Sequence, residues 1–263
     1  MIYLRSLRLK QRDGLGEGYP FDLPFVRNLE PVEFASPVTF FVGENGTGKS
    51  TLLEAIAAAA GSIAIGAADL ARDEALAPAR RLAAHLTLAW AKRTHRGFFL
   101  RAEDFANYGA RTAGLAAELD ALAEGFAEEQ RGDWQRARGL LEGQRAAIVA
   151  RYGEDLNARS HGESFLHFFG ERFVPGGLYL LDEPDTALSP QRQLALLAML
   201  KGMVARDAQF VVATHAPILL AFPGAAILAF DGETIRQVAY DEVANVRLTR
   251  AFLADPEAFL RHL

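Results

Sequence analysis

The stretch that most constrains this chain runs from Thr39 to Thr51 and reads Thr-Phe-Phe-Val-Gly-Glu-Asn-Gly-Thr-Gly-Lys-Ser-Thr. Its first four residues are apolar or β-branched, which predicts a buried strand, and an Ala- and Leu-rich helix is expected over residues 51–60. Between them lies Gly-x-x-x-x-Gly-Lys-Ser, which in a strand–loop–helix context is typical of a phosphate-binding P-loop. A glycine-rich turn with an incidental Lys-Ser would not require a strand before it and a helix after it.

The residue types of this loop suit a chain of phosphates. Gly46 and Gly48 let the backbone curl so that successive N–H groups face phosphate oxygens at the positive end of the following helix. The Lys49 ammonium can reach the β- and γ-phosphates, and the Ser50 hydroxyl can ligate Mg²⁺. We therefore expect a nucleotide to contact Gly43, Glu44, Asn45, Gly46, Thr47, Gly48, Lys49, Ser50 and Thr51.

Composition limits the classes of protein that this chain can be. Its 263 residues fit one large α/β domain or a core with one inserted subdomain, and half of them are hydrophobic. The absence of cysteine excludes a disulfide framework, thiol catalysis and thiolate metal sites. The formal charge of −5 gives no basic footprint for nucleic acid over the whole molecule. Without a signal-peptide core or a bilayer-length apolar stretch, we expect a soluble, cytoplasmic protein with no membrane insertion.

The first half of the chain is expected to contain strands, loops and a helical region. Alternation over residues 2–10 predicts a half-buried strand, and a second edge strand is expected over residues 26–34. A strand pair is expected over residues 85–92 and 97–102, joined by a polar turn. Helical spacing over residues 105–152, broken by four glycines between residues 109 and 132, predicts two or three short helices.

The loop over residues 11–24 and the second half of the chain complete this outline. Arg12 or Tyr19 could contact the adenine or ribose of a nucleotide, although a surface loop with an aromatic anchor is the better explanation. An α/β pattern returns at Leu178. Strands are expected over residues 178–181, 209–213, 226–230 and 234–238, with helices over 190–205, near Ile218, and over 242–263 with an interruption near Pro256.

Two acids follow the apolar strand that begins at Leu178. Ligands bind at the carboxyl ends of strands in open α/β sheets, so Asp182 is expected to hold Mg²⁺, directly or through water. Glu183, the next residue, can polarise an attacking water as general base. A plain acidic turn is the alternative, but a chain that already carries a P-loop favours the metal site.

The run from Asp182 to Ser189, Asp-Glu-Pro-Asp-Thr-Ala-Leu-Ser, resembles the Walker B motif and D-loop of the ABC-type ATPase superfamily. Ser189 stands where the superfamily usually has Asp. His215 follows Thr214, directly after the strand expected over residues 209–213. The resemblance implies that it is the switch histidine that contacts the γ-phosphate of ATP. A lone histidine after a strand would more often be structural. The resemblance thus implies a catalytic set of Lys49, Glu183 and His215, with ATP and Mg²⁺ as cofactors.

A second motif of the superfamily is matched less completely. The pentapeptide that begins at Ser160, Ser-His-Gly-Glu-Ser, is similar to a variant of the signature Leu-Ser-Gly-Gly-Gln. Ser160, Gly162 and Glu163 match its Ser, second Gly and Gln, whereas Arg159 and His161 depart from its Leu and first Gly. In the superfamily this motif serves the γ-phosphate bound by a partner subunit. The resemblance therefore implies an ATP-dependent homodimer.

The resemblance also implies a domain organisation. It predicts an α/β P-loop NTPase fold, with an ABC-type ATPase core and mixed sheet over residues 1–104 and 174–263. A helical insertion subdomain is expected over residues 105–173 and ends in the signature helix. Glu103 is the nearest counterpart of the Q-loop Gln, and would join Ser50 and Asp182 at the metal, although a partly exposed Glu is as often merely solvated.

Three functional classes are compatible with these motifs. The loop sequence Gly-Glu-Asn-Gly is similar to that of soluble ATPases of chromosome maintenance and DNA repair, and the chain resembles compact predicted bacterial ATPases with Ser-His-Gly-Glu in the signature. We therefore expect an ATPase that drives a conformational change on nucleic acid or a partner protein. The alternatives are the nucleotide-binding subunit of an ABC transporter, and a P-loop kinase or GTPase, which the switch histidine and the missing Asn-Lys-x-Asp motif oppose.

Two basic runs could contact nucleic acid if they share a face of the molecule. Solvated strand edges are an equally good explanation of both runs. They consist of Arg5, Arg8, Lys10 and Arg12, and of Lys92, Arg93, Arg96 and Arg101.

Overall fold

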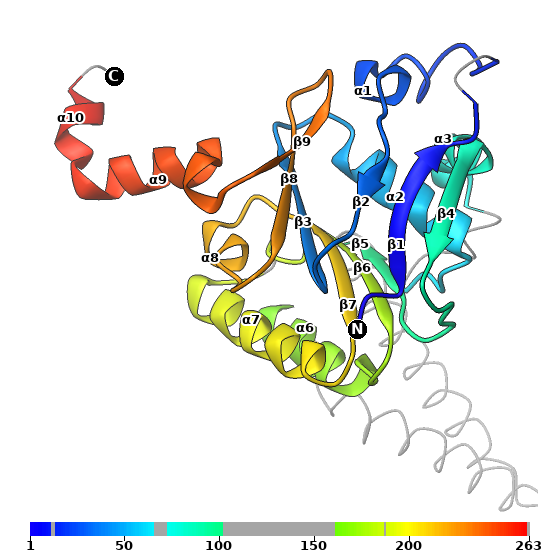
Figure 1. Cartoon of the computed structure of the whole chain (residues 1–263). Helices are drawn as coiled ribbons and strands as arrows, with labels where there is room; N and C mark the ends of the chain where they lie inside the picture. Colours follow the sequence, from blue (N-terminus) through cyan, green and yellow to red (C-terminus); the bar gives the residue numbers. More distant parts are fainter. Residues whose placement is uncertain (12–13, 66–72, 102–160, 187, 262–263) are drawn as a thin grey trace, which may run out of the picture.

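The computed structural model of the chain describes residues 1–11, 14–65, 73–101, 161–186 and 188–261 (Figure 1). Its centre is a six-stranded sheet with the order β5-β6-β7-β3-β8-β9. The strands are β3 (Val38–Gly43), β5 (Phe99–Arg101), β6 (Leu178–Asp182), β7 (Gln209–Ala213), β8 (Ala226–Phe230) and β9 (Ile235–Val238). All neighbours run parallel except β8 and β9, which form an antiparallel hairpin. The predicted mixed α/β sheet is confirmed.

A smaller antiparallel sheet lies beside this core. It has the order β2-β1-β4 and consists of β1 (Leu4–Leu9), β2 (Val32–Glu33) and β4 (Leu86–Trp90). The fully buried side chain of Gln209 joins it to the large sheet, because its Oε1 accepts from the backbone N–H groups of Tyr3 and Leu4 and its Nε2 donates to the Leu4 carbonyl. One side chain of β7 thus satisfies the backbone at the start of β1.

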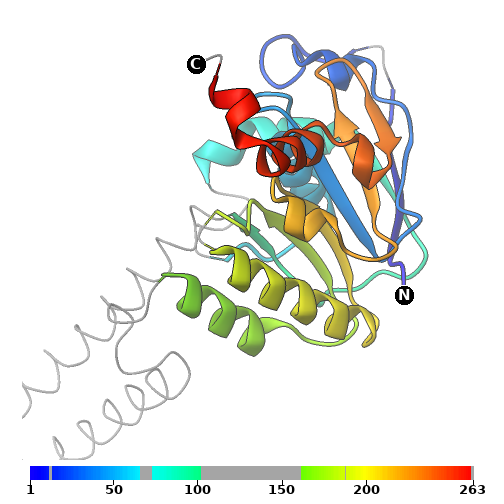
Figure 2. The ribbon, with the colours of Figure 1, turned by 90° about the vertical axis from the view of Figure 1, so that its left-hand side faces the viewer.

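Helices cover both faces of the large sheet. On one face, α2 (Lys49–Ala60) packs against α3 (Ala77–His85), and η1 (Glu74–Leu76) leads into α3. On the other, α6 (His161–Arg172) and α7 (Pro190–Val204) lie side by side (Figure 2). The remaining helical segments are α1 (Pro24–Arg27), α8 (Pro217–Leu220), η2 (Tyr240–Glu242), α9 (Ala244–Ala254) and α10 (Pro256–Leu260). The last two extend away from the body of the molecule (Figure 1).

The strand before the P-loop divides the apolar core into two clusters. Because successive side chains of a strand point to opposite faces, Phe40 packs into the cluster under α6 and α7, and Phe41 into the cluster under α2 and the small sheet. Both rings are fully buried. A strand buried on both faces in this way fixes the position of the loop that follows it.

Two expected features of the first half are wrong. Residues 26–34 do not form one strand, because Pro24 starts the short helix α1 and leaves only the two residues of β2 in a ladder. The predicted strand pair is no hairpin, since β4 pairs with β1 whereas β5 pairs with β6. Gly97, at φ +111°, lets the chain pass the Leu178 backbone so closely that an added Cβ would lie 1.8 Å from its carbonyl oxygen.

Most other expected elements agree with the structure within one or two residues. The helices expected over residues 105–152 lie outside the described residues, as do Arg12, Glu103 and Ser160. Of the helices that the structure describes, none is both long and apolar enough to cross a bilayer.

Candidate nucleotide site

The P-loop lies at the carboxyl edge of the large sheet, between the end of β3 and the start of α2. Gly46 and Gly48 adopt φ angles of +83° and +92°, in the left-handed region that glycine tolerates. A Cβ on Gly48 would lie 2.2 Å from the Phe25 ring, so α1 closes against the loop. The glycine is required at this position for two independent reasons.

The loop and the first turn of α2 form an anion site. Gly48 occupies the N-cap of α2, and no described side chain caps this helix end. The N–H groups of its first turn have no acceptor within the helix. They border a cavity of about 300 Å³ lined by Tyr19, Leu23, Asn45, Gly46, Gly48, Lys49, Ser50, Thr51 and Glu183. An uncapped helix N-terminus beside a lysine fits phosphate oxygens.

Lys49 is buried above the loop. Its Nζ donates to the carbonyl oxygens of Gly43 and Glu44, at 2.8 Å each. Burial lowers the pKa of this ammonium, while the carboxylates of Glu183 and Asp182 oppose the shift. A phosphate group would supply the anionic partner that a buried cation needs.

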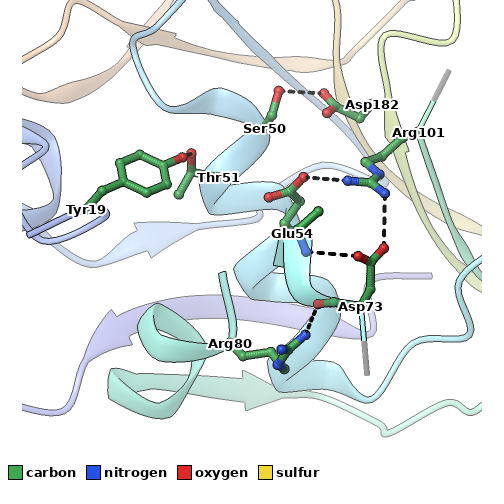
Figure 3. Close-up of polar contacts among 9 residues, drawn as sticks. Tyr19, Ser50, Thr51, Glu54, Asp73, Arg80, Arg101 and Asp182 are labelled. Atoms are coloured by element: carbon green, nitrogen blue, oxygen red, sulfur yellow. Dashed lines mark hydrogen bonds and ion pairs between the residues drawn. The ribbon is translucent and has the colours of Figure 1, made fainter. Parts of the chain in front are cut away.

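Ser50 and Asp182 meet between α2 and β6. The Ser50 hydroxyl donates to Asp182 Oδ1 at 3.1 Å (Figure 3). Burial raises the pKa of Asp182 to about 6, against the lowering effect of the Ser50 hydrogen bond. A hydroxyl and a carboxylate at this spacing are oxygen donors of the kind that Mg²⁺ accepts in addition to phosphates and water.

Glu183 lies where two cavities meet. It has a φ of +49°, unusual for a residue with a side chain, and its N–H donates to the Ala213 carbonyl at 2.9 Å. Its carboxylate accepts from the Thr186 hydroxyl at 3.4 Å. Glu183 lines both the phosphate cavity and a second cavity of about 830 Å³. Backbone strain of this kind is often found at functional positions.

His215 lies on the wall of the second cavity, next to the end of β7. Within the described part of the chain, its Nε2 is buried without a hydrogen-bond partner. The pKa of this imidazole is lowered by burial and by Lys49, and raised less by Glu183 and Asp185. An oxygen of a nucleotide's terminal phosphate would satisfy this unpaired atom.

Three side chains that support the site were not predicted. Asp185 accepts from the Thr214 hydroxyl, and that hydroxyl accepts from the Ala216 N–H at 3.0 Å, so the turn around His215 is fixed from both sides. Asn245 of α9 donates to the His215 carbonyl. The place of Asp185, two residues after Glu183, is the only signal that the sequence offered, because α9 is distant in the chain.

Tyr19, in the loop before α1, borders the phosphate cavity. Its hydroxyl lies 2.6 Å from the Thr51 Oγ1 (Figure 3), and its carbonyl accepts from Arg81 of α3 at 3.1 Å. The ring is about half exposed.

Other predicted residues are placed differently or fall outside the description. Gly162 and Glu163 lie in the first turn of α6, whereas Ser160 and Glu103 lie outside the described residues. Thr47 donates to the Glu44 carbonyl at 2.8 Å and thereby braces the loop. Arg101, counted in a basic run, is 9% exposed and contacts two carboxylates, so it is not part of a nucleic-acid surface.

Comparison with known proteins agrees with this geometry. A family model described as an AAA domain matches residues 21–69, the segment that contains the P-loop. No curated protein matches the sequence.

The whole fold resembles solved structures at low sequence identity. One is MJ1267, an ATP-binding cassette of an ABC transporter, at 16% identity and a TM-score of 0.50 over 100% of this chain and 99% of that one. A second is a putative metal-chelate type ABC transporter in an inward-facing conformation, at 15% identity and a TM-score of 0.50 over 97% and 90% of the two chains. The Smc head domain from Pyrococcus furiosus matches at 14% identity and a TM-score of 0.46 over 95% and 100%. The chain thus has the α/β fold of the ABC-type ATPase cassettes, built around a P-loop.

Proposed function

We propose that the chain binds and hydrolyses ATP with Mg²⁺, and that ATP-dependent dimerisation drives a conformational change on nucleic acid or a partner protein. The observation that carries this proposal is the convergence of Lys49, Ser50, Asp182, Glu183 and His215 on the cavities around one uncapped helix N-terminus. These side chains come from the first turn of α2 and from the ends of two neighbouring strands, β6 and β7. Each has the chemistry that phosphoryl transfer to water needs.

The residues would divide the reaction as follows. Lys49 and the first N–H groups of α2 would hold the β- and γ-phosphates, and the Ser50 and Asp182 oxygens would hold Mg²⁺, which neutralises charge on the phosphate oxygens. The Glu183 carboxylate would orient a water and accept its proton. His215 would donate from Nε2 to the γ-phosphate, which makes the site sensitive to the difference between ATP and ADP. Tyr19 would lie against the adenosine end of the nucleotide.

Substitution of the general base tests the catalytic assignment. Glu183→Gln keeps the size and polarity of the side chain but removes its ability to accept a proton. We expect ATP binding to be preserved and hydrolysis to be slowed by a factor on the order of 10²–10⁴, measured as phosphate release under saturating Mg²⁺-ATP. Lys49→Ala should instead weaken binding itself.

A matched control is Glu233→Gln, an exposed Glu in the turn between β8 and β9. It should hydrolyse ATP at the wild-type rate. Wild-type turnover by Glu183→Gln would contradict the role proposed for Glu183.

The transporter alternative uses the same chemistry with a different partner. MJ1267 and the metal-chelate system belong to ABC transporters, but a similar fold at 15–16% identity does not identify the partner of this chain. The neighbouring genes separate the two functions. A membrane permease beside this gene would favour transport, whereas a nuclease or helicase would favour work on DNA.

A further inference from the structure

Arg101 is a buried arginine that the reaction scheme above does not use. It is the last residue of β5, and its Cα is in register with that of Asp182 on the parallel neighbour β6. The residue is 9% exposed. Removing a guanidinium from water is costly unless carboxylates surround it, so its partners define its role.

Two carboxylates from different elements hold the guanidinium. Nη1 lies 3.5 Å from Glu54 Oε1 on α2, and Nη2 lies 3.5 Å from Asp73 Oδ2 in the segment before η1 (Figure 3). Both carboxylates are largely buried. The planar fork of arginine can span two acceptors in this way, whereas the single ammonium of lysine cannot hold the same geometry.

Asp73 is itself fixed to the next helical segment. Its Oδ1 accepts from the Ala75 N–H at 3.0 Å, and its carbonyl accepts from Arg80 of α3 at 2.5 Å. The Arg101 contacts therefore connect the edge of the large sheet to α2 and to the start of α3. These helices pack against each other.

The position of Glu54 relates these contacts to the metal site. Glu54 follows Ser50 by four residues on α2, so the two side chains lie on one face of the helix, one turn apart. Across the gap, Asp182 and Arg101 lie on adjacent strands. The polar contacts between this helix and the sheet include the 3.1 Å hydrogen bond from Ser50 to Asp182 and the ion pair of Arg101 with Glu54.

We propose that Arg101 is a positioning residue for the Mg²⁺ site, an inference that rests on the proposed ATPase function. By holding Glu54 and Asp73, its guanidinium sets the distance of α2 from the ends of β5 and β6, and hence the spacing of the Ser50 hydroxyl and the Asp182 carboxylate. Mg²⁺ requires short, nearly ideal octahedral coordination, whereas Ca²⁺ accepts longer and more variable distances. Loss of the Arg101 contacts should therefore weaken the binding of Mg²⁺ more than the binding of Ca²⁺.

The test compares nucleotide binding by the full chain with different cations. A fluorescent ATP analogue is titrated in EDTA, and then with increasing Mg²⁺ or Ca²⁺, for the wild type and for Arg101→Met. We expect the half-saturating Mg²⁺ concentration to rise about tenfold or more, the size seen when partners of metal ligands are removed. The half-saturating Ca²⁺ concentration should change by less than about threefold, because Ca²⁺ accepts more variable distances. The affinity for the ATP analogue in EDTA should also change by less than about threefold, because no cation is bound there.

Further variants separate positioning from charge and from general damage. Arg101→Lys keeps the charge, and its half-saturating Mg²⁺ concentration should lie between those of the wild type and Arg101→Met. Glu54→Gln should raise the Mg²⁺ requirement in the same direction, and the double variant should be less affected than the sum of both, because the two residues share one contact. Arg8→Met, on the exposed side of β1, is the matched control and should not change the requirement.

The outcomes are distinct. Arg101 is only structural if Arg101→Met has a lower melting temperature and binds the nucleotide more weakly to a similar extent with Mg²⁺, with Ca²⁺ and without a cation. If Arg101→Met does not fold, Arg101→Lys is judged by the same criterion. An unchanged Mg²⁺ requirement in both variants also overturns the proposal. If the wild type binds no nucleotide under any condition, the proposed function fails as well.

Discussion

The buried carboxyl group of Asp182, which we propose as a Mg²⁺ ligand, lowers the stability of the fold when it is charged. Its pKa is about 6 in the folded chain, above the value near 4 that an unfolded chain shows, mainly because burial disfavours the charged form. The folded protein therefore binds this proton more tightly than the unfolded one. The associated stability is fully present below about pH 4 and is lost as the pH rises through 6.

We predict that Asp182→Asn stabilises the metal-free protein at pH 8 by up to about 3 kcal/mol, since a shift of about two pKa units corresponds to that amount. Near pH 4 the difference between the variant and the wild type should vanish. Urea unfolding in EDTA at several pH values measures the difference. Asp207→Asn, at an exposed position, is the control and should show no comparable pH dependence. If Asp182→Asn lowers the free energy of unfolding at pH 8, burial does not explain the raised pKa of Asp182.

At the scale of elements, the side chain of Gln209 forms hydrogen bonds between the two sheets. Gln209 is fully buried on β7 and satisfies two N–H groups and one carbonyl at the start of β1. Replacement by an apolar residue would leave these backbone groups buried without partners, at about 1–3 kcal/mol for each unsatisfied group.

We therefore expect Gln209→Leu to lower the free energy of unfolding by at least about 2 kcal/mol, measured by denaturant titration. Gln237→Leu is the matched control, because Gln237 is exposed on β9, and it should change stability by less than about 0.5 kcal/mol. Equal effects of the two substitutions would show that the Gln209 hydrogen bonds do not hold the sheets together.

At the scale of the whole molecule, the proposed dimer explains why Ser160, Gly162 and Glu163 would matter. If this segment acts as the superfamily's signature does, it faces the γ-phosphate bound by another subunit. ATP then completes an interface that ADP cannot, and the ligand stabilises the dimer through this difference in affinity alone. Glu183→Gln should therefore be a dimer in Mg²⁺-ATP and mostly a monomer in ADP by light scattering.

Addition of Ser160→Arg should abolish this dimer while leaving nucleotide binding by the monomer largely intact. The single substitution Glu183→Gln provides the comparison. A monomeric Glu183→Gln at saturating ATP, or a double variant that still dimerises, would refute the signature assignment.

The small sheet provides the surface for the nucleic-acid prediction. Arg5 and Arg8 are exposed on β1, and Lys92, Arg93 and Arg96 are exposed after the neighbouring strand β4. Phosphate contacts through these residues should weaken steeply with salt. In a mobility-shift titration of duplex DNA with ATP, Arg5→Glu/Arg8→Glu should lower affinity, whereas Lys201→Glu on α7 should not. No binding even at low salt would direct the search to a protein partner.

The sequence by itself determined the elements whose signals are local. Gly43 to Ser50 between an apolar strand and a helix predicted the P-loop, and the apolar run before Asp182 predicted β6, because side-chain periodicity and glycine spacing act over a few residues. The resemblance in motif order predicted the ABC-type fold, which the structure confirms. Local patterns failed where a short apolar stretch suits more than one structure, as with α1 and with the separation of β4 from β5.

Only the tertiary structure decided which distant side chains meet. Arg101 looked like one of several exposed bases, but the placement of β5 beside β6 brings it between Glu54 and Asp73. In the same way, Gln209 reaches β1 across 205 positions of the chain, and Asn245 reaches the carbonyl of His215. Sequence patterns report which face of an element is apolar. The pairing of buried polar groups depends on which elements pack together, and that is decided by the burial of the whole core.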